Sequence, residues 1–234
     1  MSAWLLLTII FIALAVIVIL KKSKAKTAYK HFFKKAIKGH FPGNPDALIN
    51  EVEELFAGLS KDTQFASRSS NPVDRRLDFC AYFLALIKVL ENRGLSFEQI
   101  RSICLEITID YVSPKNTMQK WLKRLPARLI GLRITKPLLN LFSKKVSIKG
   151  HPDGFRAVIL TDKTETYDLG YGIDILECGI CKLFQKHDAG KYAAILCEVD
   201  KVTSGLAGLE LIRTGTIANG AAKCDFRFKK INTD

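Results

Sequence analysis

The cysteines are the most chemically reactive residues of this 234-residue chain. They are Cys80, Cys104, Cys178, Cys181, Cys197 and Cys224. Cys178 and Cys181 form a Cys-x-x-Cys pair, which suits a redox pair or half of a zinc site. A zinc ribbon needs a second such pair, whereas Cys197 and Cys224 stand alone in different predicted elements. We therefore expect no metal, with a four-cysteine site as the alternative.

Cys178 is set apart by its place in the sequence. It follows a predicted strand and begins a predicted helix, where the helix dipole lowers the pKa of a thiol. This position favours a nucleophilic thiolate, and the alternative is a small packing residue at a strand-to-helix turn. Cys80 and Cys104 lie on apolar faces of predicted helices, where a cysteine behaves as a small buried hydrophobic residue.

The common cofactor and hydrolase signatures are missing from the sequence. It contains no glycine-rich phosphate loop, no HExxH and no GxSxG. We therefore expect no cofactor, and the cysteines remain the leading candidates for chemistry.

Four segments of the second half occur in a recognisable order: ECGICKLF (177–184), ILCEVD (195–200), ELIRTGTIANG (210–220) and CDFRF (224–228). With these segments the chain resembles the L-2-amino-thiazoline-4-carboxylic acid hydrolase family, over roughly residues 74–230. The family pattern falls on Cys178, Cys197, Asp200, Arg213, Thr214, Thr216, Gly220, Cys224, Asp225 and Arg227, and not on Cys181. One departure is Ala221-Ala222-Lys223, because family members often place an acidic residue just after the glycine.

The resemblance implies a hydrolase that opens a small cyclic amidine or a related substrate with a non-peptide C–N bond. Such a reaction needs a nucleophile, an acid–base residue and a cation that binds the carboxylate of the substrate. The candidate nucleophiles are Cys178, Cys197 and Cys224, and the candidate acid–base residues are Asp200 and Asp225. The candidates for binding the carboxylate are Arg213 and Arg227, with Thr214 and Thr216 as further substrate-binding residues. For Asp225 and Arg227, a cross-strand pair on the sheet is the alternative.

The elements that position these residues divide the chain into two regions. Residues 29–149 carry apolar residues at helical spacing, whereas residues 150–234 contain β-branched and aromatic runs typical of strands. The second region is expected to follow a β-β-α-α-β-β order, with strands 155–161, 166–175, 209–216 and 224–228 and with helices 178–187 and 189–203. This order predicts an α+β fold with an antiparallel sheet, in which residues 29–234 form one domain.

Capping residues and turns mark the elements of the helical region. Asp46 is expected to cap one helix, and Ser96 with Gln99 forms a capping box at the start of another. The other expected elements are a basic, aromatic interfacial helix at 27–38, a Ser-rich loop at 61–72 and a helix at 74–92.

Residues 1–28 are expected to form a transmembrane anchor with a polybasic flank. Residues 3–20 are uncharged and almost entirely apolar, and as a helix they span about 27 Å, close to the thickness of the hydrocarbon core. Lysines 21, 22, 24 and 26 follow this stretch and no basic residue precedes it, which disfavours a cleaved signal peptide. The positive-inside rule then predicts a single-pass membrane protein whose soluble domain faces the cytoplasm, where cysteines stay reduced.

The formal net charge of +13 is concentrated in two stretches without acidic residues, one before Asp46 and one at 111–152. A basic stretch next to a transmembrane helix gains about 1 kcal/mol per residue at an anionic leaflet. We therefore expect anionic lipid to be the partner of the first stretch. The second stretch is open to two interpretations, a membrane-surface helix and a solvated outer face. No nucleic-acid partner is expected, because aromatic residues are not interleaved as in known modules.

Two functions of different classes remain in competition. The first is a membrane-anchored hydrolase acting on a small-molecule substrate. The second is a non-catalytic ligand- or metal-binding sensor domain tethered to the membrane, in which the cysteines hold a metal or line a pocket. Stoichiometric zinc or iron in the purified protein would favour the second function.

Overall fold

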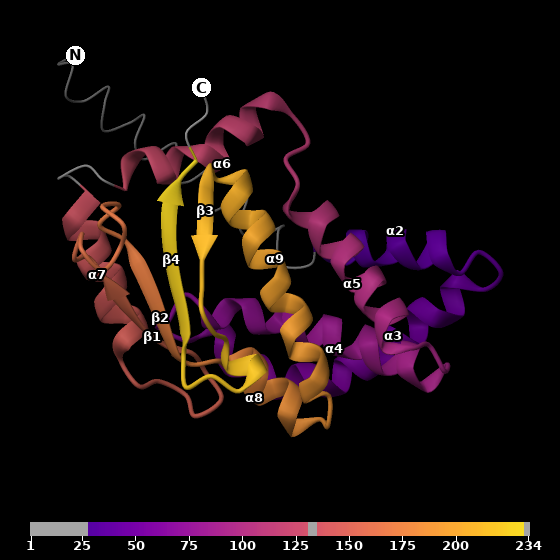
Figure 1. Cartoon of the computed structure of the whole chain (residues 1–234). Coiled ribbons are helices and arrows are strands. Elements are labelled where there is room, and N and C mark those ends of the chain that lie inside the picture. The colour runs from indigo at the N-terminus through magenta and orange to yellow at the C-terminus, as the bar shows by residue number, and fades with distance from the viewer. Residues whose placement is uncertain (1–27, 131–134, 232–234) are drawn as a thin grey trace, which may run out of the picture.

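The computed structural model describes residues 28–130 and 135–231, and its helices precede its sheet along the chain (Figure 1). The α-helices are α2 (Lys30–His40), α3 (Pro45–Leu59), α4 (Leu77–Asn92), α5 (Phe97–Val112), α6 (Thr117–Leu129), α7 (Lys136–Ser147), α8 (Gly179–Lys186) and α9 (Ala193–Leu206). The strands are β1 (Arg156–Leu160), β2 (Gly172–Glu177), β3 (Leu209–Ile212) and β4 (Cys224–Lys230). Short 3-10 helices are η1 (Ser60–Ser67), η2 (Asp74–Arg76), η4 (Gly190–Tyr192) and η5 (Ile217–Asn219). The predicted α+β class with a helical first part is confirmed.

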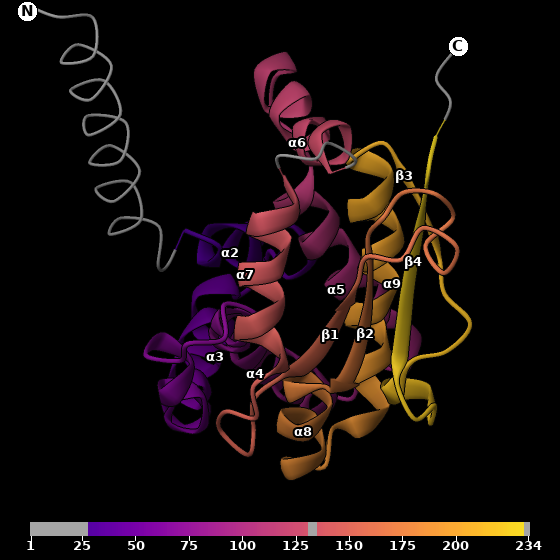
Figure 2. The same ribbon diagram turned by 90° about the vertical axis from the view of Figure 1, so that its left-hand side faces the viewer.

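The four strands form one antiparallel sheet in the spatial order β1-β2-β4-β3. Along the chain, two strands are followed by α8 and α9 and then by two more strands, as predicted. The last strand inserts between β2 and β3, so that Cys224 lies opposite Ile175 near the end of β2. Helix α7 packs along β1 and helix α9 packs against β3 (Figure 2). The sheet therefore brings the start of β4 close to the junction of β2 and α8.

Two strands, β2 and β3, are shorter than predicted by about one half. The second strand was expected from residue 166, but β2 begins at Gly172, because Tyr167 and Asp168 have φ angles of 50° and 62°. Positive φ angles are incompatible with an extended strand. The third strand was expected to reach residue 216, but β3 ends at Ile212 because the next backbone N–H groups turn toward the carboxylate of Asp225.

The helix caps agree with the sequence at one position and differ at another. The capping box of Ser96 and Gln99 is confirmed at the start of α5. Helix α3 is capped by Asn44 and not by Asp46, because the side chain of Asn44 accepts the N–H of Ala47 at 3.3 Å. The expected loop at 61–72 is also wrong in its first half, where η1 continues directly from α3.

Helix α4 lies at the centre of the core and is buried along nearly its whole length. The cluster around it joins side chains of α2, α3 and α5 to Phe155, Cys178 and Ile195 of the second region. Figure 1 shows the arrangement, with the first helices on the right, the sheet on the left and α9 between them. The helical and sheet regions therefore share one hydrophobic core.

The predicted transmembrane segment, residues 3–20, lies outside the described residues. Within 28–130 and 135–231, no helix is both long and apolar enough to cross a bilayer. Helix α2 occupies most of the predicted interfacial helix, but it buries Phe33, Ala36 and Ile37 in the protein core. These side chains pack within the protein, so the expectation that this face of the helix lies at a membrane interface is wrong.

Candidate active site

Cys178 lies where β2 ends and α8 begins. It is the N-cap of α8 and has the extended φ and ψ angles of −107° and 108°. A Cβ atom on Gly179 would lie 2.9 Å from the carbonyl oxygen of Asp153 and 3.1 Å from Leu77 Cδ2. Glycine therefore allows the start of α8 to approach α4 closely. The prediction that Cys178 stands at a strand-to-helix junction is confirmed.

The surroundings of Cys178 favour its thiolate. The thiol of Cys181, in the first turn of α8, and the backbone N–H groups of Cys181 and Ile180 lie near the sulfur of Cys178. Interaction with these donors lowers the pKa of Cys178 to about 7, although burial opposes it. The pKa of Cys181 is raised, because the neighbouring sulfur of Cys178 favours its protonated form and because the thiol is buried.

The other four cysteines are in places that favour the neutral thiol. Burial raises the pKa of Cys197 to about 12, and it also raises the pKa of Cys224. Burial likewise raises the pKa values of Cys80 and Cys104. All six cysteines are free, so no disulfide removes any of them from chemistry. Cys178 is therefore the cysteine best prepared to act as a nucleophile.

A cavity of about 1380 Å³ lies between the sheet and the helices, with Cys178 on its wall. Cys197 of α9, Cys224 of β4 and Cys80 of α4 also line it, together with Asp200 of α9. The fold thus brings the three predicted nucleophiles and one predicted acid to the same space. Among the residues that the structure describes, no group of three or more His, Cys, Asp and Glu side chains is arranged to hold a metal ion.

Asp200 is positioned by Arg213. Arg213 Nη1 donates to Asp200 Oδ2 at 2.7 Å, and Arg213 Nη2 donates to the carbonyl oxygen of Cys197 at 3.0 Å. The guanidinium also lies over the ring of Phe226, 5.0 Å from its centroid. Burial raises the pKa of Asp200 above its usual value, although the hydrogen bond from Arg213 opposes this. Arg213 therefore holds the carboxyl group of Asp200 at the cavity, and its own guanidinium is occupied by the bonds to Asp200 and Cys197.

Asp225 and the threonines predicted to bind substrate organise the turn between β3 and β4. Asp225 accepts the hydroxyl of Thr214 at 2.6 Å and the backbone N–H of Gly215 at 2.9 Å. Thr216 caps η5, where its hydroxyl oxygen accepts the N–H of Asn219 at 3.2 Å. The structure gives Asp225, Thr214 and Thr216 turn contacts and does not bring them to the cavity wall.

Arg227 lies within the sheet. It forms an ion pair at 2.8 Å with Asp174 on β2, and Lys223 pairs with the same carboxylate at 2.5 Å. These two cations lower the pKa of Asp174, although burial opposes them. Arg227 therefore forms a cross-strand pair between β4 and β2, the alternative considered for it from the sequence, whereas Asp225 bonds to the turn before its strand.

Three arginines at the cavity were not singled out from the sequence. Arg68, Arg75 and Arg76 line it, and within the described part of the chain their guanidinium groups make no hydrogen bond or ion pair. Arg76 acts electrostatically on both Asp200 and Cys80. The available signal was the spacing of Arg76 and Cys80, because residues four apart lie on the same face of a helix.

A buried aspartate fixes the segment that carries Arg75 and Arg76. Asp74 Oδ1 accepts the backbone N–H of Phe155 at 2.7 Å, and Oδ2 accepts the hydroxyl of Ser69 at 2.5 Å. The amide of Asn71 donates to the carbonyl oxygen of Phe155 at 2.8 Å. These bonds tie η2 to the residue before β1, and thereby hold the arginines at the cavity.

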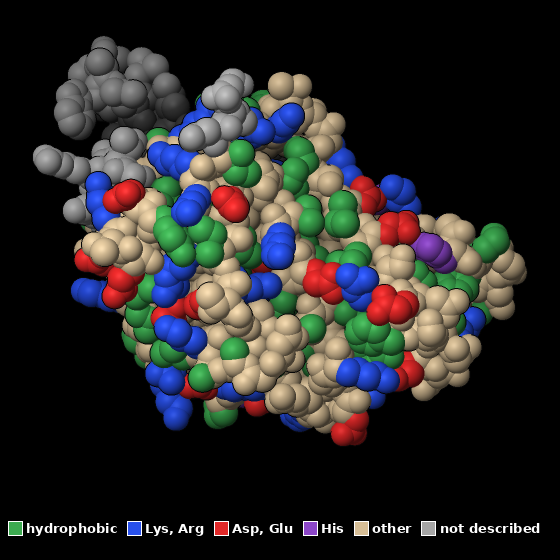
Figure 3. All heavy atoms as spheres, in the orientation of Figure 1, with side chains coloured by type: hydrophobic (Ala, Val, Ile, Leu, Met, Phe, Trp, Pro, Cys, Tyr) green, Lys and Arg blue, Asp and Glu red, His purple; other side chains and the backbone are tan. Residues whose placement is uncertain are grey.

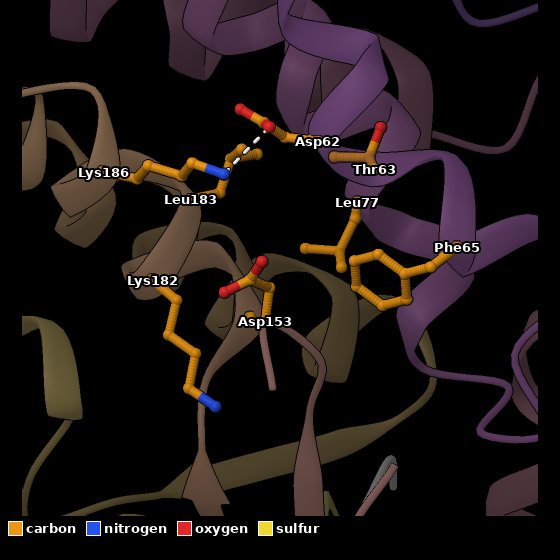
Figure 4. A pocket seen from close by; sticks show the side chains of 9 residues that line it. Asp62, Thr63, Phe65, Leu77, Asp153, Lys182, Leu183 and Lys186 are labelled. Carbon is orange, nitrogen blue, oxygen red and sulfur yellow. Dashed lines mark hydrogen bonds and ion pairs between the residues drawn. The ribbon is translucent and has the colours of Figure 1, made fainter. Parts of the chain in front are cut away.

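A second hollow lies between η1 and α8, and Figure 4 shows its side chains. Its volume of about 10 Å³ suffices for a single water molecule at most. Asp62 forms an ion pair with Lys186 at 2.9 Å and a hydrogen bond with His187 Nε2 at 2.8 Å. These contacts of Asp62 hold η1 against the end of α8. They thereby fix η1, which forms part of the wall of the large cavity.

In the comparison with protein families, residues 75–228 match the model of the L-2-amino-thiazoline-4-carboxylic acid hydrolase family. The chain belongs to this family. The match spans well over half of the chain and includes Arg76, Cys178, Asp200 and Cys224. No curated protein and no solved structure matched the chain.

The boundary of the family match divides the cavity. The thiols, Asp200 and Arg76 come from residues within the matched range, whereas Tyr29, Phe56 and the wall formed by η1 precede it. The candidate catalytic end of the cavity is thus the part shared with the L-2-amino-thiazoline-4-carboxylic acid hydrolase family.

Proposed function

We propose that the protein is a hydrolase that opens a small cyclic amidine or a related C–N bond substrate, with Cys178 as its nucleophile. The observation that carries the proposal is the position of Cys178 at the start of α8 and on the wall of a cavity, where the Cys181 thiol and the first N–H groups of the helix favour its thiolate. Membership of the L-2-amino-thiazoline-4-carboxylic acid hydrolase family supports the class of reaction.

The reaction begins when the Cys178 thiolate attacks the amidine carbon and forms a C–S bond. The ring opens as the bond from this carbon to a ring heteroatom breaks, and the heteroatom takes a proton from Asp200. Burial suits Asp200 to this role, because its raised pKa favours the protonated carboxyl group. Water then attacks the same carbon and returns its proton to Asp200, and the Cys178 thiolate leaves. The net change is the addition of one water molecule.

Arg76 is the residue that we propose to bind the acidic group of the substrate. Its guanidinium is without an ion-pair partner among the described residues, and it lies within electrostatic range of Asp200. A planar guanidinium binds a carboxylate through two parallel hydrogen bonds. Arg76 therefore takes the role that the sequence suggested for Arg213 and Arg227, both of which are engaged with aspartates.

The proposal is tested by the turnover of 2-amino-thiazoline-4-carboxylate and related cyclic amidines by the purified full chain. Cys178→Ser should abolish turnover while the melting temperature stays close to that of the native protein. Cys104→Ala is the matched control, because Cys104 is buried on α5 and does not line the cavity. Full activity of folded Cys178→Ser would refute the proposal. Binding of a ligand or of stoichiometric zinc without turnover would support the sensor alternative.

We also propose that residues 3–20 anchor the protein in a membrane and that the folded domain faces the cytoplasm. The order of the apolar stretch and the lysines that follow it supports this topology. A reporter fused after Asp234 should be cytoplasmic, and a signal from the opposite side would overturn the topology.

The surface of α6 and α7 supports an additional contact with anionic lipid. Large apolar side chains are exposed on both helices: Met118, Trp121, Leu122, Leu138 and Leu141. Figure 3 shows basic side chains along the upper edge of the molecule, where α6 lies in Figure 1. The described lysines and arginines of these two helices form no ion pairs with the described acidic residues. Exposed apolar and basic residues together are typical of a helix that binds a membrane surface.

A further inference from the structure

The cavity beside Cys178 is much larger than a cyclic amidine. Its volume of about 1380 Å³ exceeds the roughly 300–1,000 Å³ of common small-molecule sites. A single ring with one carboxylate would occupy a small part of this space. The remaining apolar wall would stay in contact with water, so a ligand that also covers the wall gains free energy of binding.

The wall changes in character from the sheet to the helices. Cys178 and Asp200 lie in the second half of the chain, at the start of α8 and on α9, whereas the helices of the first half contribute an aromatic surface. Phe79 and Tyr111 stack there with ring centroids 5.0 Å apart, and Tyr29 meets Phe79 edge-on at 5.3 Å. These three rings line the cavity as one continuous apolar wall.

The charged groups of the cavity leave an excess of positive charge. Its two aspartates are engaged, since Asp78 accepts the hydroxyl of Tyr29 at 2.8 Å and Asp200 pairs with Arg213 at 2.7 Å. The guanidinium groups of Arg68, Arg75 and Arg76 have no such partner among the described residues. The cavity therefore favours a ligand that carries an anionic group.

Part of the apolar surface of the cavity comes from outside the family match. Tyr29 and Phe56 precede residue 75, where the match begins. Tyr29 also follows the apolar stretch 3–20 by only nine residues. A cavity whose wall begins so close in sequence to a membrane-spanning segment is well placed for a ligand that partitions into membranes.

We infer that the substrate is an amphiphilic acid with a tail of acyl or aromatic carbon. Its head carries the reactive amidine or C–N carbon, which lies at Cys178, and an anionic group, which binds Arg76. Its tail covers the wall formed by Tyr29, Phe79 and Tyr111. The inference rests on the proposed hydrolase function for the reactive carbon, and it adds the tail and its binding surface.

Tail binding is tested on the full chain in phosphatidylcholine nanodiscs, with fatty acids from butyrate to decanoate as probes and empty nanodiscs as the blank. Each methylene that the wall covers should lower the dissociation constant about fourfold, since burying one CH₂ contributes roughly 0.8 kcal/mol. Val112→Trp fills the helical end of the cavity and should abolish this dependence on chain length. Ile109→Trp should preserve it, because Ile109 is exposed on the same helix and does not line the cavity.

Two further results decide the inference. Decyltrimethylammonium carries a tail of the same length on a cation, so it should bind more weakly than decanoate. Equal binding of the cation, or an equal chain-length dependence in Val112→Trp and Ile109→Trp, would overturn the amphiphile inference. Turnover of a short cyclic amidine is measured separately. If the short amidine is hydrolysed but tail length has no effect, only this inference fails, whereas tail binding without turnover of any cyclic amidine, short or tailed, would refute the hydrolase.

Discussion

Removing the thiol of Cys181 should raise the pKa of its neighbour Cys178. In the native protein, the interaction with the Cys181 thiol is the largest of the effects that lower the pKa of Cys178 to about 7. A hydrogen bond to a charged group contributes roughly 1.5–3 kcal/mol, and about 1.4 kcal/mol corresponds to one pKa unit. Cys181→Ala should therefore raise the pKa of Cys178 by about 1–2 units.

The effect on reactivity follows from two opposing changes. At pH 7 the thiolate fraction of Cys178 should fall from about one half to between about one tenth and one hundredth. A thiolate of higher pKa is intrinsically more nucleophilic, by about threefold per unit. The alkylation rate at pH 7 should therefore fall by about two- to sixfold, and above about pH 8 the variant should react faster than the native protein.

The assay follows the alkylation of each cysteine by iodoacetamide from pH 5.5 to 10, with peptide mass spectrometry to separate the sites. Cys104→Ala is the control, since it removes a cysteine that has no hydrogen bond to Cys178. A folded Cys181→Ala whose Cys178 titrates at the native midpoint would refute the reasoning. It would mean that the backbone N–H groups of α8 alone set the pKa of Cys178.

Four other predictions test separate parts of the account. The value of kcat/KM should rise with pH through about 7, because deprotonation of Cys178 below its ordinary pKa produces the nucleophile, and a flat profile between pH 6 and 8 would argue against it. Arg76→Ala should raise KM for a carboxylate substrate by at least tenfold and leave KM for its amide analogue nearly unchanged, whereas equal effects on both would exclude a carboxylate contact. Asp225→Ala should lower the free energy of unfolding by about 1–3 kcal/mol, because it removes the acceptor of two backbone N–H groups. Turnover per folded molecule should equal that of the native protein, and a selective loss of turnover would show that Asp225 acts in the active site. Residues 29–234 should sediment with anionic vesicles in a salt-sensitive manner and should lose this binding in Trp121→Ala/Lys123→Glu, whereas indifference to lipid charge would favour a solvated outer face for α6.

Local patterns predicted the parts of the fold that depend on neighbours in sequence. The junction before Cys178 and the capping box at Ser96 are examples, because strand alternation and capping depend on a few consecutive residues. The start of β2 was missed, since Tyr167 has high strand propensity yet takes a positive φ angle in a turn. Asp46 was predicted to cap α3, but the cap is Asn44. Asn and Asp suit the cap position about equally well, so residue type alone does not identify the first residue of this helix.

The composition of the site could be predicted only in part, because contacts between distant segments decide it. Asp200 and Asp225 both belong to the family pattern, so the sequence does not separate them. In the structure, Asp200 on α9 lines the cavity, whereas Asp225 accepts the hydroxyl of Thr214 in the turn. The role of Arg76 depends on where β1 meets η2 through Asp74, and no local pattern reports this contact. Cys181 was set aside as outside the family pattern, although helical geometry places its thiol against Cys178.

The most direct test of the central claim, that Cys178 is the nucleophile, is to alkylate the full chain with substoichiometric iodoacetamide at neutral pH. Residual turnover of a cyclic amidine and the labelled fraction of each cysteine are measured on the same samples. The account predicts that Cys178 is labelled first and that activity falls in direct proportion to its labelling. Turnover that persists after Cys178 is fully labelled, or that falls with the labelling of Cys197 or Cys224 instead, would contradict it.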